Sequence, residues 1–268
     1  MQVPQTVLPG GPIPGVANII GVASGKGGVG KSTLSVNLAL SLARSGARTG
    51  LLDADIYGPS IPLMLNVRQE PVLTPEQKMM PVLSHGIALM SIGFIAAEDA
   101  PVVWRGPLLA QALQQFLTQV EWGQLDYLII DLPPGTGDIP LTLSQSLALS
   151  GIVAVTTPQD VALEDVARGI GMFEKVEVDI LGVVENMSYF LCPHCDERHE
   201  VFGHGGGRQA AAERGLEFLG EIPLDASICA GGDQGAPVAM QADTPVAALF
   251  DEIAAGMVAQ LQRLADEG

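Results

Sequence analysis

The stretch Gly25-Lys-Gly-Gly-Val-Gly-Lys-Ser32 decides the fold of this chain. It fits the pattern Gly-x4-Gly-Lys-[Ser/Thr], whose glycines let successive backbone N–H groups point inward at one phosphate. In this pattern the ammonium of Lys31 lies near the β- and γ-phosphates of a nucleotide, and the hydroxyl of Ser32 coordinates Mg²⁺. The octapeptide therefore predicts a site for ATP and Mg²⁺. The residues expected to bind ATP are Gly25, Lys26, Gly27, Gly28, Val29, Gly30, Lys31, Ser32 and Thr33.

The residues on either side of this loop have the arrangement that phosphate binding requires. Residues 18–24 form a short apolar run typical of a buried parallel strand, and residues 33–44 carry apolar side chains at helical spacing. Gly46 marks the expected end of that helix. A strand, a glycine loop and a helix in this order place the positive end of the helix at the phosphate. The alternative is an ordinary glycine-rich turn between a strand and a helix.

The rest of the chain alternates apolar runs with helical patterns, which predicts an α/β fold: a doubly wound, mostly parallel sheet with helices on both faces. The expected strands cover residues 48–52, 86–92, 125–130, 151–156, 180–185 and 216–222. The expected helices cover residues 107–120, 141–149, 161–175, 208–214 and 246–265. We expect residues 16–268 to form one domain after a flexible N-terminal lead-in at residues 1–15. Two stretches, residues 56–85 and 187–207, are expected to be mobile loops.

The composition argues against several classes of protein. The 268-residue chain has a net charge of −17 and only four lysines, which disfavours binding to nucleic acid or to an anionic membrane surface. Its apolar runs are too short to span a membrane, and its start lacks the apolar segment of a signal peptide. Three cysteines, an odd number, do not make a disulfide framework. We therefore expect a cytoplasmic protein in a reducing compartment.

Acidic residues follow two of the predicted strands. In open α/β sheets ligands bind beyond the carboxyl ends of the strands, so these side chains are expected beside the glycine loop. Asp131 follows the strand at 125–130 and is the expected holder of Mg²⁺. Asp55 is the candidate to orient or deprotonate the attacking water, and Asp53 is a further candidate for organising the metal. Each of these carboxylates has an alternative role as the cap of a strand end or a loop.

The sequence Cys192-Pro-His-Cys195 is the second informative feature, because two thiolates at this spacing can grip one metal centre. Three interpretations stay open. A zinc site would take both cysteines with His199 and His204. A redox disulfide of the thioredoxin type would need the motif at the start of a helix, where it does not lie. A [4Fe–4S] cluster takes four thiolates, and a twofold dimer would supply two such pairs. Cys229 is most simply a small structural residue.

Taken together, the motifs resemble those of the Mrp/ApbC group of ATP-dependent iron–sulfur cluster carriers, which are close to the MinD/ParA ATPases. The resemblance extends over nearly the whole chain from about residue 16. The motifs that carry it are Lys26 with Lys31, Asp-Ala-Asp-Ile-Tyr-Gly-Pro-Ser at 53–60, Asp-Leu-Pro-Pro-Gly-Thr-Gly-Asp at 131–138, Thr-Thr-Pro-Gln-Asp at 156–160, Glu-Asn-Met-Ser at 185–188 and the cysteine pair at 192–195.

This resemblance implies a P-loop NTPase fold of the SIMIBI type and slow ATP hydrolysis. It implies a homodimer that bridges a labile [4Fe–4S] cluster through Cys192 and Cys195 of each subunit and transfers it to apo-proteins, with a cluster-assembly scaffold as a further partner. Lys26 resembles the signature lysine that reaches the partner's nucleotide. Asn186 and Pro223 would lie at the adenine.

Two rival functions belong to other classes. A positioning or partitioning ATPase of the MinD/ParA kind needs a surface that binds membrane or DNA. The final helix at 246–265 does not suit this role, because it is acidic and carries a single arginine. An electron donor resembling nitrogenase reductase would carry its cluster cysteines well apart in the sequence rather than paired. The carrier is therefore the expected function.

Overall fold

The centre of the molecule is an eight-stranded sheet. The structure is a computed structural model and describes residues 13–94, 119–137, 140–141 and 148–267. The strands lie in the order β12-β9-β8-β1-β7-β2-β6-β5, and neighbouring strands are parallel except for β5, which runs antiparallel to β6. The strands are β1 (Val16–Ser24), β2 (Thr49–Asp53), β5 (Val82–Ser84), β6 (Ile87–Ser91), β7 (Leu125–Asp131), β8 (Gly151–Thr156), β9 (Ile180–Glu185) and β12 (Phe218–Glu221).

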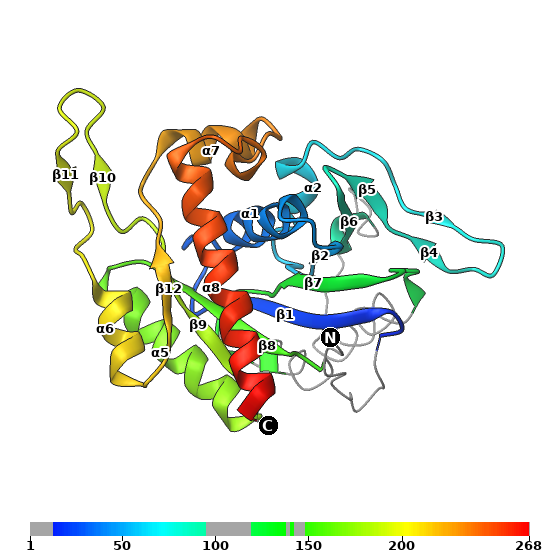
Figure 1. Cartoon of the computed structure of the whole chain (residues 1–268), viewed down its shortest axis with the longest axis horizontal. Helices are drawn as coiled ribbons and strands as arrows, with labels where there is room; N and C mark the ends of the chain where they lie inside the picture. The colour runs from blue at the N-terminus through cyan, green and yellow to red at the C-terminus, as the bar shows by residue number, and fades with distance from the viewer. Residues whose placement is uncertain (1–12, 95–118, 138–139, 142–147, 268) are drawn as a thin grey trace.

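Helices cover both faces of this sheet (Figure 1). Helices α1 (Lys31–Arg44) and α8 (Pro245–Glu267) pack against each other on one face, and α5 (Asp160–Lys175) and α6 (Gly206–Glu213) pack together over β8 and β9 on the other. This arrangement confirms the doubly wound, mostly parallel sheet expected from the sequence.

The pleat of the strands explains why two separate cores form. Successive side chains of a strand point to opposite faces. Ile129 and Val153 accordingly belong to the cluster under α1 and α8, whereas Ile130 and Ile152 belong to the cluster under α5. The central strands are largely apolar because both faces are covered, as is typical of parallel sheets. Ile13, near the end of the predicted lead-in, is buried in the second of these clusters.

The predicted strands and helices that lie within the described residues are confirmed, with ends that differ by one or two residues in most cases. The predicted helix at 107–120 lies outside the described residues except for its last two, and most of the predicted helix at 141–149 also lies outside them. Helix α7 (Ala226–Asp233) had no counterpart in the sequence prediction. Its two glycines and two alanines weaken the hydrophobic periodicity by which a helix is recognised.

The two stretches expected to be loops contain regular structure. Residues 56–85 include α2 (Ile61–Met64), a small hairpin of β3 (Val72–Leu73) and β4 (Met79–Met80), and the edge strand β5. Residues 187–207 include a second hairpin, β10 (Phe190–Leu191) with β11 (Arg198–His199), and the start of α6. Elements of two to four residues are too short to show a period, which is why the sequence pattern missed them.

The carboxyl ends of the central strands meet at one edge of the sheet, where the glycine loop leaves β1. Asp53 at the end of β2 is paired in register with Asp131 at the end of β7 and with Ser91 at the end of β6. Glu185 ends β9 in register with Thr156 of β8. The remaining short helices are η1 (Ile92–Phe94) and η2 (Val238–Met240). Within the described part of the chain, no helix combines the length and the apolar character needed to cross a bilayer.

Candidate nucleotide site and cysteine hairpin

The glycine loop is an open concave turn that ends directly on a helix. Helix α1 begins at Lys31, and its N-cap residue Gly30 has φ +89°, a left-handed conformation that glycine adopts without strain. A Cβ atom added at Gly27 or Gly28 would meet nothing within 4 Å, so both positions face open space. The N–H groups of the first turn of α1 are unpaired within the helix and carry partial positive charge. The loop therefore presents the backbone surroundings that an anionic phosphate requires.

Lys31 is buried at the mouth of this loop between two carboxylates. Its ammonium nitrogen lies 2.8 Å from Oδ2 of Asp131 and 3.3 Å from Oδ2 of Asp55. The hydroxyl of Ser32 donates to the same Oδ2 of Asp131 at 2.6 Å, and the hydroxyl of Ser35 donates to Oδ1 at 2.7 Å. The structure thus brings together four residues that the sequence assigned to the site. Ser35 was missed, although its position four residues after Lys31 places it on the same face of the helix.

Asp53 lies deeper than the other carboxylates and is completely buried. Its Oδ1 accepts from the backbone N–H of Asp55, and its Oδ2 accepts from the backbone N–H of Ile61 and from the Ser91 hydroxyl. Burial, together with the charge of Asp131, raises the pKa of Asp53 to about 7. Asp53 therefore ties both ends of the segment that carries Asp55 to the sheet, and its role toward Mg²⁺ stays a prediction.

The side chains at the mouth of the loop fit ATP and Mg²⁺. Mg²⁺ prefers oxygen ligands, and the Ser32 hydroxyl and the Asp131 carboxylate lie within hydrogen-bond distance of each other beside the loop. Lys31 supplies a buried positive charge at the same point. A bound Mg²⁺ would be held by Ser32 and Asp131 and would neutralise the charge of the phosphates.

Asn186 contacts the glycine loop from the neighbouring strand end. Its side-chain amide donates to the backbone carbonyl of Val29 at 2.8 Å, and a Cβ at Gly30 would lie only 2.0 Å from that amide nitrogen. Pro223 is buried two residues after the end of β12. The structure thus places Asn186 against the loop, and the adenine contacts of Asn186 and Pro223 stay predictions.

The cysteine pair lies on the hairpin β10–β11, which stands away from the sheet (Figure 1). The backbone N–H of Cys192 donates to the carbonyl of Glu197 at 3.0 Å, and the N–H of Asp196 donates back to the carbonyl of Cys192 at 2.9 Å. Both cysteines are free thiols, and Cys195 is exposed. The backbone N–H of His194, the Cys195 thiol and the Cys195 backbone N–H lower the pKa of the Cys192 thiol. These donors favour the thiolate of Cys192, the form that binds metals.

The two cysteines and two histidines of the zinc interpretation do not gather as one set of ligands in the described residues of the single chain. His199 lies on β11 beside the Phe190 ring, and Nδ1 of His204 lies 2.9 Å from the Arg198 guanidinium at the base of the hairpin. Among the described residues, a group of three potential metal ligands forms only from Glu185, His204 and Glu221, and it includes no cysteine. His199 lies on β11 and His204 lies beyond the end of that strand, whereas the two cysteines lie in the turn between β10 and β11.

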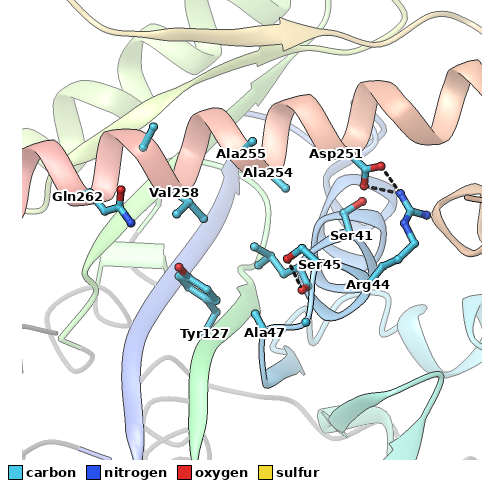
Figure 2. A pocket seen from close by; sticks show the side chains of 13 residues that line it. Ser41, Arg44, Ser45, Ala47, Tyr127, Asp251, Ala254, Ala255, Val258 and Gln262 are labelled. Atoms are coloured by element: carbon cyan, nitrogen blue, oxygen red, sulfur yellow. Dashed lines mark hydrogen bonds and ion pairs between the residues drawn. The ribbon is translucent and has the colours of Figure 1, made fainter. Parts of the chain in front are cut away.

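A separate cavity lies between α1 and α8 (Figure 2). It is lined by Ser41, Tyr127 and Ala254, and Arg44 forms an ion pair with Asp251 at its border. None of the predicted site residues lines it. The cavity is therefore distinct from the nucleotide site.

The fold and the loop together define a P-loop nucleotide-binding protein of the MinD/ParA structural class. The model of a protein family described as ParA, NUBPL iron-transfer P-loop NTPase, matches residues 15–258. The chain belongs to this family, which confirms the resemblance drawn from the motifs.

Relatives with curated names are similar over most of the chain. The chain is 52% identical over 252 residues to the Arabidopsis thaliana "Iron-sulfur protein required for NADH dehydrogenase, mitochondrial", covering 93% of this chain and 80% of the relative. It is 51% identical to the Mus musculus "Iron-sulfur cluster transfer protein NUBPL", covering 94% of this chain and 80% of that protein. It is 50% identical to the Salmonella typhimurium "Iron-sulfur cluster carrier protein", covering 93% of this chain and 68% of that protein.

Solved structures agree with this assignment. A nucleotide-binding protein from Archaeoglobus fulgidus, solved in complex with ADP, is 41% identical with a TM-score of 0.76, covering 86% of this chain and 90% of that one. A more distant match is the MinC:MinD cell division protein complex of Aquifex aeolicus. It has 20% identity and a TM-score of 0.67, and the match covers 91% of this chain and 96% of that chain. The second comparison shows the shared fold alone.

Proposed function

We propose that this protein binds and hydrolyses ATP and carries a labile [4Fe–4S] cluster between two copies of the chain, from which the cluster passes to apo-proteins. The observation that carries the proposal is the pair of free thiols on an outward-standing hairpin in a chain of the iron-transfer P-loop family. One chain offers two thiolates at this site, and a [4Fe–4S] cluster usually takes four. A twofold dimer supplies the other two at its axis.

The nucleotide site has a residue for each task in phosphoryl transfer. Lys31 and the N–H groups of the loop bind the phosphates, and Ser32 and Asp131 hold Mg²⁺. Asp55, which contacts Lys31, orients or deprotonates the attacking water. Lys26 reaches the nucleotide of the partner subunit, so hydrolysis depends on the dimer. Turnover is slow, because a conformational step rather than the chemistry sets its rate.

The partners of this function are other proteins. A cluster-assembly scaffold supplies the cluster, and apo iron–sulfur proteins receive it. The net charge of −17 disfavours nucleic acid and anionic membranes as partners. The free thiols require a reducing compartment, and we place the protein in the cytoplasm.

Anaerobic reconstitution with iron and sulfide, followed by iron, sulfide and zinc analysis, tests the proposal. We expect about four iron and four sulfide per pair of chains. Cys192→Ala and Cys195→Ala should lose both elements and still fold. Cys229→Ala is the matched control and should retain them, because Cys229 lies on α7 and not on the hairpin. Retention of iron and sulfide by Cys192→Ala, or zinc in their place, would refute the assignment.

A further inference from the structure

Glu185 fixes both ends of the cysteine-bearing segment to the sheet. Its carboxylate is completely buried at the end of β9. Oε1 accepts from the Ser188 hydroxyl at 2.6 Å and from the backbone N–H of Gly205 at 3.1 Å, and Oε2 accepts from the backbone N–H of Gly207. Ser188 precedes the hairpin and the two glycines follow it. One buried side chain therefore determines where both ends of the segment leave the body of the protein.

A second carboxylate extends this attachment to the hairpin itself. Oε2 of Glu221 lies 3.0 Å from the Ser188 hydroxyl, and both oxygens of Glu221 accept from the Arg198 guanidinium at 2.9 and 3.2 Å. The same guanidinium lies over the ring of Tyr189, 3.9 Å from its centroid. Arg198 belongs to β11 and Tyr189 immediately precedes β10, so the base of the hairpin is held on both strands.

The group Glu185, His204 and Glu221 also has the composition of a divalent-cation site. Arg198 already supplies positive charge there, since it pairs with Glu221 and its Nη2 lies 2.9 Å from Nδ1 of His204. Glu185 in turn is satisfied by three donors from the protein. The cluster is therefore better described as a closed network of ion pairs and hydrogen bonds than as a metal site.

The network begins one residue from Asn186, which contacts the nucleotide loop. Asn186, the next residue after Glu185, donates to the carbonyl of Val29 in that loop and is itself fixed by a backbone hydrogen bond to Thr156. At the end of β9, Asn186 thus contacts the nucleotide loop, and the adjacent Glu185 contacts the segment that carries the two cysteines.

We propose that Glu185 is a positioning residue that couples the nucleotide loop to the cysteine hairpin. The inference rests on the proposed function in taking Cys192 and Cys195 as the ligands of the cargo. Occupation of the loop by nucleotide is transmitted through Asn186 and Glu185 to Ser188, Gly205 and Gly207, and changes the surroundings of the two thiols. Such coupling needs a contiguous set of contacts and a measured dependence of one site on the other.

The rate of thiol alkylation in the full-length, cluster-free protein measures this dependence. The reduced protein is treated with iodoacetamide in three states: without nucleotide, with Mg²⁺ and ADP, and with Mg²⁺ and a non-hydrolysable ATP analogue. Mass spectrometry then gives a rate for each cysteine. We expect nucleotide to change the rates at Cys192 and Cys195 by about fivefold or more, the lower range of allosteric couplings, and to leave the rate at Cys229 unchanged.

Glu185→Gln is the decisive variant, because its amide keeps one acceptor oxygen and replaces the other by N–H, so either Gly207 or the pair Ser188 and Gly205 loses its acceptor. We expect it to bind nucleotide like the unsubstituted chain, while the ratio of alkylation rates with and without nucleotide falls to near one. Glu197→Gln is the matched control: this exposed side chain lies on the same hairpin and contacts neither Glu185 nor Glu221. It should keep the full ratio.

A second variant tests whether a folding defect, rather than lost coupling, explains the result for Glu185→Gln. Ser188→Ala leaves Glu185 and its bonds to Gly205 and Gly207 in place and removes the hydroxyl that lies between the carboxylates of Glu185 and Glu221, so the ratio should fall in a chain that melts normally. A full nucleotide-dependent ratio in both variants, or no ratio in the unsubstituted chain, would overturn the coupling. Because no cluster is present, these outcomes are separate from the iron and sulfide analysis that tests the carrier function.

Discussion

Lys31 and Asp131 form a buried ion pair, with 2.8 Å between the ammonium nitrogen of the lysine and Oδ2 of the aspartate. Lys31 begins α1 and Asp131 ends β7, so the pair joins the first turn of the helix to the carboxyl edge of the sheet. The exposed fractions of the two side chains are 6% and 0%. Because both charges are shielded from water, the pair positions the lysine where the phosphates and Mg²⁺ of a nucleotide are expected.

Substituting Lys31→Ala should weaken nucleotide binding. Charge-assisted hydrogen bonds contribute about 1.5–3 kcal/mol, which corresponds to a loss of about tenfold to a hundredfold in affinity. Titration with a fluorescent ATP analogue measures this loss. Lys26→Ala is the comparison: if Lys26 serves the partner's nucleotide, this variant should keep the affinity of the isolated subunit and lose the hydrolysis that depends on the dimer. Equal affinity of Lys31→Ala and the unsubstituted chain would contradict the assignment.

Gly30→Ala should damage the loop through two separate effects. An alanine at φ +89° costs about 1–2 kcal/mol in backbone strain. Its Cβ would also lie 2.0 Å from the Asn186 amide nitrogen, so the bond from Asn186 to Val29 must break. Gly46→Ala is the matched control, because Gly46 has φ +96° and a Cβ there meets nothing within 4 Å.

Urea unfolding and nucleotide titration separate these two effects. Both variants should lose a similar amount of stability from strain, and only Gly30→Ala should lose nucleotide affinity. A Gly30→Ala chain that binds nucleotide normally would show that the contact between Asn186 and the loop is dispensable.

Asp53 should make the stability of the nucleotide-free, Mg²⁺-free protein depend on pH. Its folded-state pKa of about 7 lies above the ordinary value of 3.8, chiefly because of burial. Between these values the native state binds a proton that the unfolded chain has lost, so the contribution of this group to stability falls as pH rises and is constant above about pH 7. Asp53→Asn has no such proton.

The free energy of unfolding of Asp53→Asn, measured against that of the unsubstituted chain, should therefore increase from about pH 4 to pH 7 and then level off. Chemical denaturation at several pH values gives this difference. Lost hydrogen bonds of Asp53 shift the whole curve without changing its slope. A difference that does not vary with pH would show that the carboxylate is ionised throughout.

Cys192 should react as a thiolate at lower pH than an ordinary thiol. Three neighbouring donors, led by the backbone N–H of His194, lower its pKa. The rate of alkylation at Cys192 in the cluster-free protein should therefore reach half its maximum below the midpoint of a cysteine in a denatured control. Cys195→Ala removes one of the three donors and should move that midpoint upward, whereas Cys195→Ser retains a donor and should move it less. Identical midpoints in all three chains would exclude the Cys195 side chain as a cause.

Much of the nucleotide site was predictable because its residues lie on elements with strong local patterns. The glycine loop is one continuous motif, and Asp131 stands at the end of a seven-residue apolar strand. Ser91 and Ser35, by contrast, contact these carboxylates without belonging to any motif. Their roles follow from strand register and helix geometry, which bring distant positions together only after the chain has folded.

The family resemblance predicted that Asn186 serves the nucleotide, and the structure adds that it holds the loop at Val29. Glu185 received no role from the sequence. A single glutamate after an apolar strand has many uses, and its partners at Ser188, Gly205 and Gly207 are up to 22 residues away. The zinc alternative also depended on tertiary geometry: in the described residues its cysteines and histidines are close in the sequence but do not form one group of ligands.

The sequence by itself determined the parallel α/β architecture, the phosphate loop and the two thiols, because apolar periodicity, glycine spacing and short-range ligand spacing are local properties of the chain. Only the tertiary structure decided which side chains surround Lys31 and how the cysteine segment is attached to the sheet. Those relationships join strand ends that are far apart in the chain, and they exist because the carboxyl ends of parallel strands converge at one edge.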